Sequence, residues 1–259
     1  MKTYQMWSGG KDSTASIILE HIHGLPKSEI VFCEVMFDIE KGISGEDPEH
    51  IEFINNVAIP LLKTWGYEIT ILRANIDYKY IFYRPVSSRT KHPERIGKPR
   101  GFVLGRGCTV RRDCKLDPTK KYTRQKKEEG YSQIIGIASD EPERLERLNG
   151  GDYSLLDRYG YTEKMCLDLC REYGLLSPIY DNSTRGGCWF CPNSKIKEMA
   201  EFKQKHPDYW EELRTMSKTP GLITQGFKWG KTFAEVDKEI DEYIEAKKAQ
   251  ISIWNMKGE

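Results

Sequence analysis

The chain has 259 residues, enough for one large α/β domain with an appendage or for two smaller domains. Its apolar fraction of 38% and mean hydropathy of −0.63 indicate an ordinary core, and no stretch approaches the ~20 apolar residues of a membrane-spanning helix. The chain opens in a β-rich stretch rather than in the apolar region of a signal peptide. We therefore expect a cytoplasmic protein with no membrane partner.

The net charge of +1 hides a strong asymmetry along the chain. Between Arg84 and Lys127 there are 15 Lys or Arg residues and 3 Asp or Glu residues. This basic stretch predicts an anionic partner, either a phosphorylated substrate or a nucleic acid. A solvated surface loop is the alternative interpretation.

A strand, a glycine turn and a helix are predicted at the start of the chain. The apolar stretch Tyr4–Trp7 leads into Ser8-Gly9-Gly10-Lys11-Asp12-Ser13, and an apolar-periodic run follows from Ala15. We expect the helix to begin at Ser13 or Thr14. Adjacent glycines permit a tight bend, and the first N–H groups of a helix attract anions. With the charge of Lys11 added, the segment predicts a phosphate site; a chance Gly-Gly turn is the alternative.

The same six residues resemble the signature of the PP-loop family, the ATP pyrophosphatases. They differ from the Walker motif, which places four residues between its glycines and continues with Gly-Lys-Ser/Thr. The resemblance implies that the turn grips the β,γ-pyrophosphate of ATP, which is then cleaved between the α and β phosphates. The residues that it assigns to ATP are Ser8, Gly9, Gly10, Lys11, Asp12 and Ser13.

The next predicted elements are a buried strand and a long helix. Residues 30–37 form a mostly apolar, β-rich run that ends at Asp38. Asp47 and Pro48 are a typical helix start, with Asp as N-cap and Pro in the first turn. We expect a kink at Pro60 and the end of the helix at Gly66.

Third and fourth strands are predicted at residues 68–72 and 133–138. Strands that alternate with helices indicate an α/β fold, with an open, mostly parallel sheet covered by helices on both faces. Between these two strands lies a polar segment of about residues 75–130, which we interpret as a substrate-covering excursion with a short helix after Pro118.

Polar residues follow the second and fourth strands, where ligands of open parallel sheets bind. Asp12 and Asp38 are candidates to hold Mg²⁺, although a helix-terminal role and a turn role are the respective alternatives. Asp140 and Glu141 follow the fourth strand. Arg144, with Arg147, is a candidate phosphate ligand, and a helix-surface ion pair is the alternative.

Seven cysteines, an odd number without a secretion signal, argue against a disulfide scaffold. Cys188-Trp-Phe-Cys191 is a Cys-x-x-Cys knuckle, which either binds a metal or acts as a redox pair. We expect Zn²⁺ or a [4Fe–4S] cluster on four thiolates, with His206 as an alternative to Cys114. The expected set is Cys108, Cys114, Cys188 and Cys191; we expect Cys33, Cys166 and Cys170 to pack in the core.

We expect the α/β domain to occupy residues 1–180 and the knuckle with its helices to occupy residues 181–259. Helical patterns cover Thr162 to Tyr173 and Lys195 to Lys205, and a last amphipathic helix begins near Phe233. The carboxy-terminal part is therefore predicted to be a smaller, helical appendage that carries the cysteine knuckle.

Further motifs resemble the phosphoadenosine phosphosulfate (PAPS) reductase-like branch of the PP-loop superfamily. They occur in the order of that family, over about residues 4 to 215. The knuckle has the form common in phage and bacterial genomes. The matching residues are Cys108-Thr109 with Lys115 to Pro118, Gly136-Ile137 with Asp140-Glu141 and Arg144, and Cys188 to Pro192 with His206-Pro207 and Trp210.

The sequence also departs from that family. PAPS reductases carry a catalytic cysteine in a Glu-Cys-Gly-x-His-like tail, and here no cysteine follows Cys191. The related assimilatory sulfate reductases hold a [4Fe–4S] cluster with an adjacent Cys-Cys pair, whereas five residues separate Cys108 from Cys114. The DNA phosphorothioation sulfurtransferase is a relative with a more similar expected reaction, because it resembles a PAPS reductase but uses ATP on a nucleic acid.

The resemblance implies an ATP pyrophosphatase that uses ATP and Mg²⁺ to adenylate a nucleotide or nucleic acid, so that sulfur or nitrogen can then be transferred. Lys11, Asp12 and Arg144 are the expected catalytic residues. One alternative is a sulfonucleotide reductase acting on PAPS. Another, from a different class, is a catalytically inactive module that binds nucleotides or nucleic acid.

Overall fold

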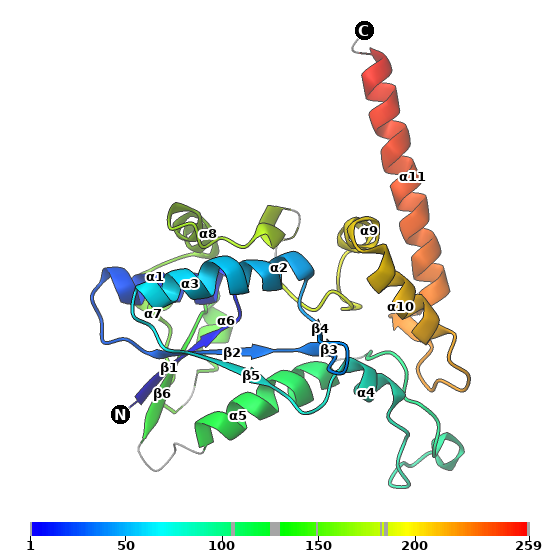
Figure 1. Cartoon of the computed structure of the whole chain (residues 1–259), viewed down its shortest axis with the longest axis horizontal. Helices are drawn as coiled ribbons and strands as arrows, with labels where there is room; N and C mark the ends of the chain where they lie inside the picture. Colours follow the sequence, from blue (N-terminus) through cyan, green and yellow to red (C-terminus); the bar gives the residue numbers. More distant parts are fainter. Residues whose placement is uncertain are drawn as a thin grey trace. The chain divides into compact units, whose positions relative to one another are not determined.

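The computed structural model describes residues 2–104, 107–124, 130–148, 150–181, 183 and 186–257, the last seven of them without side chains (Figure 1). Two compact units divide the chain, and each is discontinuous in sequence. Unit 1 comprises residues 1–75 and 111–187, and unit 2 comprises residues 76–110 and 188–259. The expected excursion of residues 75–130 is thus split between the units, and its first part groups with the carboxy-terminal residues.

A four-stranded, fully parallel sheet forms the centre of unit 1, which confirms the predicted α/β class. The strand order is β5-β2-β1-β6, so the chain moves outward from β1 on one side and then returns to the other side with β6. The point between β1 and β6 is therefore the switch in strand order, beside which ligands of such sheets bind. The strands are β1 (Lys2–Trp7), β2 (Glu29–Glu34), β5 (Ile69–Arg73) and β6 (Tyr131–Ile135).

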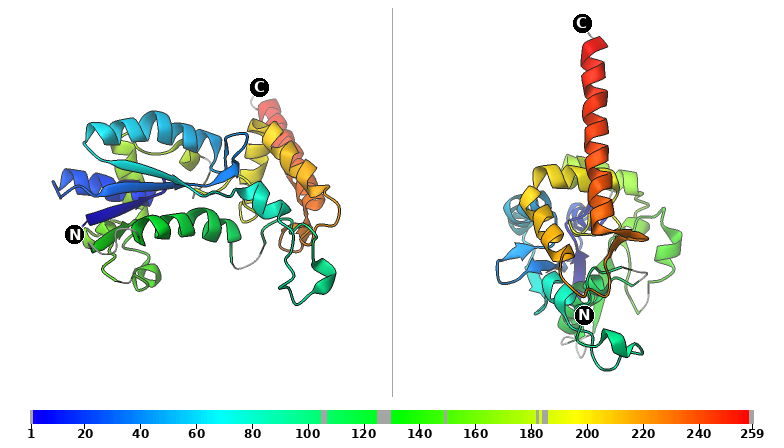
Figure 2. Two further views of the ribbon diagram at one scale, coloured as in Figure 1. Left: turned by 60° about the horizontal axis from the view of Figure 1, so that its bottom comes forward. Right: turned by 90° about the vertical axis from the view of Figure 1, so that its right-hand side faces the viewer.

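Helices cover both faces of this sheet (Figures 1 and 2). One face carries most of the core, in which Trp7 and Phe32 of the strands pack with buried helical residues such as Ile18 and Leu62. The helices of this layer are α1 (Lys11–Ile22), α2 (Pro48–Phe53), α3 (Ile59–Thr64), α7 (Leu155–Arg158) and α8 (Glu163–Glu172). On the other face α5 (Asp117–Arg124) contacts β2 and β5, and Tyr122 packs edge-on against Tyr4 of β1.

The second strand is shorter than predicted. The expected run of residues 30–37 is divided after Glu34, and β3 (Met36–Asp38) pairs antiparallel with β4 (Ile43–Ser44) instead of extending the main sheet. The carbonyl of Val35 accepts a hydrogen bond from the N–H of Gly45 at 2.7 Å. The chain therefore leaves the parallel sheet at Val35, and Asp38 ends a small separate ribbon.

The predicted helix after Asp47 is present in three consecutive segments. The Asp47 carboxylate accepts hydrogen bonds from the N–H groups of Glu49 and His50, as an N-cap does. A kink was expected at Pro60; the helix is interrupted just before it by a π turn, η1 (Ile54–Ala58), between α2 and α3. Gly66 ends the helix with φ of +83°, a conformation that favours glycine.

Unit 2 is built on an aromatic core. The rings of Phe82, Phe102, Trp210, Phe227 and Phe233 contact one another and are all buried. The helices of this unit are α4 (Tyr78–Tyr83), α9 (Ile196–Lys205), α10 (Pro207–Ser217) and α11 (Phe233–Lys257), and its strands are β7 (Gly226–Lys228) and β8 (Lys231–Thr232). Within the described residues, none of the helices has both the length and the apolar character required to traverse a bilayer.

Candidate functional site

The glycine turn between β1 and α1 is held from behind by a buried histidine. Gly9 has φ of +73°, and a Cβ there would lie 2.5 Å from Ile54 Cδ1 and 2.8 Å from His50 Cε1. His50 Nε2 lies 3.1 Å from the Ser8 carbonyl, and His50 Nδ1 lies 2.7 Å from the Ser177 hydroxyl. Because a carbonyl only accepts, Nε2 carries the hydrogen and Nδ1 accepts from Ser177. Any side chain at Gly9 would break this support.

Helix α1 begins at Lys11, with Gly10 as its N-cap, two or three residues earlier than the expected start at Ser13 or Thr14. The reason is that Ser13 acts inside the first turn, where its hydroxyl donates to the Gly10 carbonyl at 3.1 Å. The Lys11 N–H donates to the hydroxyl of Tyr180 at 2.9 Å. An oxygen atom therefore already occupies the position at the helix start where an anion oxygen binds well.

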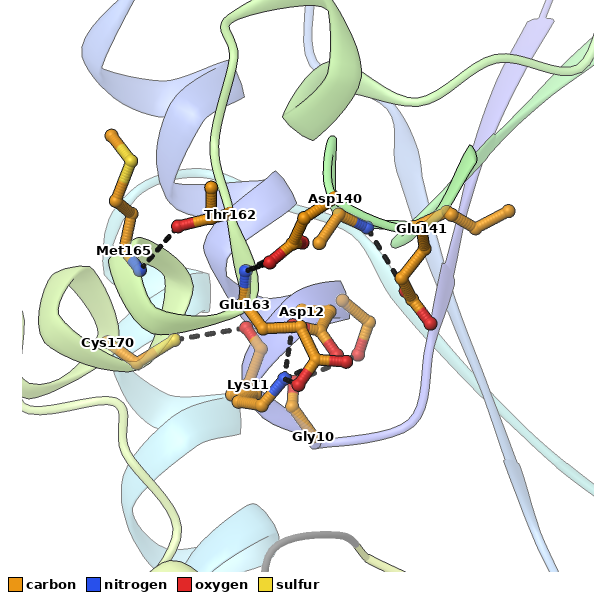
Figure 3. A network of polar contacts seen from close by, with 12 residues as sticks. Gly10, Lys11, Asp12, Asp140, Glu141, Thr162, Glu163, Met165 and Cys170 are labelled. Carbon is orange, nitrogen blue, oxygen red and sulfur yellow. Dashed lines mark hydrogen bonds and ion pairs between the residues drawn. The ribbon is translucent and has the colours of Figure 1, made fainter. Parts of the chain in front are cut away.

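The Lys11 ammonium lies between two carboxylates (Figure 3). Its Nζ atom is 2.8 Å from Asp12 Oδ1 and 3.1 Å from Glu163 Oε2, and the residue is only 7% exposed. Burial by itself lowers the pKa of Lys11, but the two carboxylates outweigh burial and the net pKa is raised. Lys11 is therefore a fixed positive charge at the mouth of the turn.

The pKa of Asp12 is shifted upward, whereas that of an ordinary ion-paired carboxylate is shifted downward. Burial raises its pKa, the contact with Lys11 lowers it, and the negative charges of Glu163 and Glu141 raise it again. The net pKa is raised. A dication or any further positive charge beside Asp12 would thus stabilise its ionised carboxylate.

Gly136, directly after β6, lies against the start of α1. A Cβ at Gly136 would be 2.6 Å from the Ser13 nitrogen and 2.7 Å from the Ser13 Cα, both backbone atoms that cannot move aside easily. Only glycine allows this approach. The end of β6 and the turn after β1 therefore meet at the switch in strand order.

A cavity of about 1090 Å³ opens beside the turn, and all its lining residues belong to unit 1. Its floor is the α5-facing side of the sheet, with Met6, Val31 and Ile135. Six basic residues line it against three acidic ones, so it is suited to a polyanion. The basic residues are Lys11, Arg111, Lys115, Lys120, Arg124 and Arg144, and the acidic residues are Asp12, Glu46 and Glu163.

The residues predicted to bind ATP separate into two groups. Ser8, Gly10, Lys11, Asp12, Ser13 and Arg144 line the cavity, and Gly9 forms the turn behind them. The others have structural contacts outside the lining. Asp38 accepts the Lys41 N–H at 3.0 Å, Asp140 accepts the Glu163 N–H at the start of α8, and Glu141 pairs with Arg144.

The predicted metal ligands belong to different units. Cys108, Cys188 and Cys191 are in unit 2, and their charges, after burial itself, contribute to a raised pKa of the buried Tyr78 phenol. Cys114 is in unit 1, where it is buried and its carbonyl accepts the Cys33 thiol. Within the described part of the chain, no group of three or more His, Cys, Asp or Glu residues is arranged to hold a metal ion.

The cysteines expected to be structural are buried. Cys33 packs at the sheet, and Cys166 and Cys170 lie in the core between α8 and α1. The Cys170 thiol donates to the Lys11 carbonyl at 3.2 Å, and burial raises its pKa to about 12. These thiols stay protonated at neutral pH and support the turn by packing.

Sequence reasoning missed four residues of this site, namely His50, Glu163, Ser177 and Tyr180. His50 lies on the predicted helix after Asp47, but the spacing of apolar residues along that helix gave no reason to place His50 against Gly9. Glu163 stands at a helix start, where an acidic residue has an ordinary explanation in the helix dipole. No local signal marks the other two.

Comparison with known proteins gives limited similarity. No family model matches the chain. An uncharacterized protein of Methanocaldococcus jannaschii is 23% identical over 223 residues, which cover 80% of this chain and 39% of that protein, so the chain spans well under half of its length. The phosphoadenylyl-sulfate (PAPS) reductase of Candida auris, solved with phosphate, aligns with a TM-score of 0.42 and 11% identity over 73% of this chain and 82% of that chain.

Fold and site together define an α/β protein whose central parallel strand runs through a glycine turn into a helix, beside a basic cavity.

Proposed function

We propose that the chain is a PP-loop ATP pyrophosphatase, which adenylates a nucleotide or nucleic-acid acceptor for transfer of sulfur or nitrogen. The observation that carries the proposal is the position of Lys11, a buried cation at the first turn of α1, on the wall of a basic cavity. A helix start with a neighbouring ammonium favours phosphate oxygens. The resemblance of residues Ser8 to Ser13 to the PP-loop signature supports the class of reaction, which is cleavage of ATP between its α and β phosphates.

The triphosphate of ATP fits the turn with its β and γ groups near Gly10, Lys11 and Ser13. An oxygen of the acceptor attacks the α-phosphorus, a new P–O bond forms, and the bond to the β-phosphate oxygen breaks, so pyrophosphate leaves with the electron pair. Lys11 stabilises the charge that grows on that leaving group. Arg144, which lines the same cavity and is paired with Glu141, is the second cation that we assign to the phosphates.

Mg²⁺ would arrive with the nucleotide and be held mainly by phosphate oxygens, with Asp12 as the protein carboxylate in the turn. The raised pKa of Asp12 fits a position that favours added positive charge. Asp38 lies outside the cavity lining, so we assign it no part in holding Mg²⁺. The ion would neutralise phosphate charge.

The acceptor has room beside the wall of the cavity that α5 forms. Four basic residues of this wall come from the segment that leads into α5 and from α5 itself, which contacts β2 and β5 of the sheet. A cavity of about 1090 Å³ is slightly larger than the roughly 300–1,000 Å³ typical of small-molecule sites. We assign this side to the phosphate of the acceptor, and its basic residues are Arg111, Lys115, Lys120 and Arg124.

The test is release of pyrophosphate from ATP by purified protein, with and without candidate acceptors. We expect Lys11→Ala to lower this rate by about 100-fold or more, because it removes a transition-state charge contact. Lys63→Ala, at an exposed lysine of α3 in the same unit, is the matched control and should leave the rate unchanged. Normal pyrophosphate release by Lys11→Ala would refute the proposal. So would a parent protein that binds ATP tightly but turns it over with none of the acceptors tested.

Tyr180→Phe separates binding from chemistry. The Tyr180 hydroxyl accepts the Lys11 N–H and lines the cavity, so its own hydrogen is available to a phosphate oxygen. We expect the variant to bind ATP several-fold more weakly. Tighter binding would mean that the phenol blocks the helix start instead of assisting it.

A further inference from the structure

Three exposed aromatic side chains stand out on unit 2. Trp229 is 86% exposed, Tyr80 is 50% exposed and Tyr83 is 40% exposed. In the part of the chain that the structure describes, they are the aromatic members of the set of exposed large hydrophobic residues, and all three belong to this unit. Single exposed rings are ordinary on a protein surface, but three of them on one unit are a candidate interaction site when a further feature points the same way.

A basic segment runs between these aromatics along the chain. From Arg84 to Arg100 there are six Lys or Arg residues and one acidic residue, Glu94. Among the described residues, Arg89, Lys91, Lys98 and Arg100 make no ion pair, and all four are exposed. Their charge is therefore available to a polyanion.

The hairpin that carries Trp229 is joined to this basic segment by backbone pairing. The N–H of Thr224 donates to the Arg100 carbonyl at 2.8 Å, and the N–H of Ile223 donates to the Pro99 carbonyl at 3.0 Å. Gly101, with φ of +86°, allows the contact, since a Cβ there would lie 2.2 Å from the Thr224 oxygen. Figure 2 shows both segments at the same end of this unit.

Buried rings under the surface connect the exposed ones. Phe82, beside Tyr83 on α4, contacts Phe102 with ring centroids 5.1 Å apart, and Phe102 contacts Phe227 at the same separation. Trp229 follows Phe227 at the tip of the β7–β8 hairpin, whose Lys228 is tied to the Pro192 and Ser194 carbonyls after the cysteine knuckle. The three exposed aromatics thus belong to segments that share one packed aromatic core.

We propose that unit 2 binds a single-stranded nucleic acid, whose bases stack on Trp229, Tyr80 and Tyr83 and whose phosphates contact the basic segment. Exposed aromatic rings together with cations that make no ion pair suit an open strand, because every base has a face that stacks and every nucleotide carries a phosphate. A duplex hides its base faces and leaves the aromatics without a partner. This deepens the proposed function by naming single-stranded nucleic acid as its acceptor class.

The test is equilibrium binding of labelled oligothymidylate, oligouridylate and a duplex of the same length, about 20 nucleotides, by fluorescence anisotropy in the absence of ATP. We expect the full chain to bind a single strand more tightly than the duplex, and the two single-stranded probes distinguish DNA from RNA. Trp229→Ala should weaken single-strand binding about 5-fold or more, and Trp229→Phe should retain most of the affinity.

Two charge-reversal variants, one in the basic segment and one in unit 1, test the phosphate contacts. Lys91→Glu should weaken binding and reduce the slope of log affinity against log salt by about 0.7. Lys63→Glu makes the same charge change in unit 1 and should leave the slope unchanged. Both side chains are exposed, so folding is unaffected.

Equal affinity of Trp229→Ala and the parent for single strands would overturn the proposal, as would no binding of either single strand or stronger binding of the duplex. A protein partner captured by Trp229 in place of nucleic acid would also overturn it. Since no ATP is present, failure here leaves pyrophosphate release by Lys11 untouched, and the two proposals fail separately.

Discussion

The Lys11 ammonium lies 3.1 Å from the Glu163 carboxylate, which belongs to the first residue of α8. Together with Asp12, Glu163 holds the only lysine of the glycine turn in the absence of a ligand. A phosphate that approaches Lys11 must share it with these carboxylates. Glu163 is half-exposed, so it can turn away into solvent more easily than Asp12.

Replacing Glu163 by Gln should tighten the binding of pyrophosphate and ATP. The change removes a negative charge beside the site while keeping the shape of the side chain, and we expect a gain of about 2- to 10-fold at a partly exposed pair. Isothermal titration calorimetry measures it, and Glu172→Gln at the exposed end of the same helix is the control. Weaker binding would show that Glu163 helps to bind the ligand, for example through a cation.

Gly136→Ala should destabilise unit 1 and weaken ATP binding. Its Cβ would lie 2.6 Å from the Ser13 backbone nitrogen, so β6 and the start of α1 must separate. Such overpacking costs about 1 to 3 kcal/mol in the free energy of unfolding. Urea unfolding measures this cost, and Gly187→Ala, where a Cβ meets nothing within 4 Å, is the control. Equal stability of the two variants would contradict the close approach.

The stability of unit 1 should depend on pH through Asp47. Burial and the neighbouring Glu49 carboxylate raise the pKa of Asp47 from its ordinary value of 3.8 to about 6. Because the folded state holds this proton more tightly, the associated stability is present below about pH 4 and is lost as the pH rises through about 6. At neutral pH, where Asp47 is charged, unit 1 is therefore less stable than it would be with Asp47 protonated.

Asp47→Asn should remove that dependence and raise the free energy of unfolding at pH 7 by about 1 kcal/mol. Asparagine retains the N-cap role toward the N–H groups of Glu49 and His50. Thermal unfolding at pH 4 and pH 7 measures the difference between variant and parent. A variant that is less stable than the parent at pH 7 would show that the Asp47 charge stabilises the helix start instead.

The cysteine site stays a prediction that metal analysis can check. We expect protein purified without oxygen to carry zinc or iron, and Cys188→Ser or Cys191→Ser to lose most of it, because each removes a thiolate ligand. Broad visible absorption would identify an iron–sulfur cluster, and a colourless metal-loaded protein would identify zinc. Cys166→Ser, at a buried core position, is the control. Metal-free parent protein would contradict the site.

The sequence predicted the centre of unit 1 because its signals are local. An apolar strand, two glycines and a periodic helix occur within the first 22 residues, and Asp47, Pro48 and Gly66 mark a helix by their own chemistry. The alternation of strands and helices then required a parallel sheet. For the same reason the Cys166 and Cys170 pair was correctly expected in the core.

Contacts between distant segments could not be read in this way. The grouping of residues 76–110 with the carboxy-terminal part depends on ring contacts such as Phe102 with Phe227, which have no counterpart in local pattern. Tyr180 reaches Lys11 only through the fold. Asp38 was expected at the sheet edge because the run before it is mostly apolar, but the strand leaves the sheet at Val35.

The central claim is that the turn after β1 holds the triphosphate of ATP. A crystal structure with the α,β-methylene analogue of ATP tests it most directly, because the analogue cannot be cleaved at the bond in question. We predict its β and γ phosphates within hydrogen-bonding distance of the Lys11 ammonium and of N–H groups at the start of α1. An analogue bound elsewhere in the cavity, with Lys11 still held only by Asp12 and Glu163, would contradict the account.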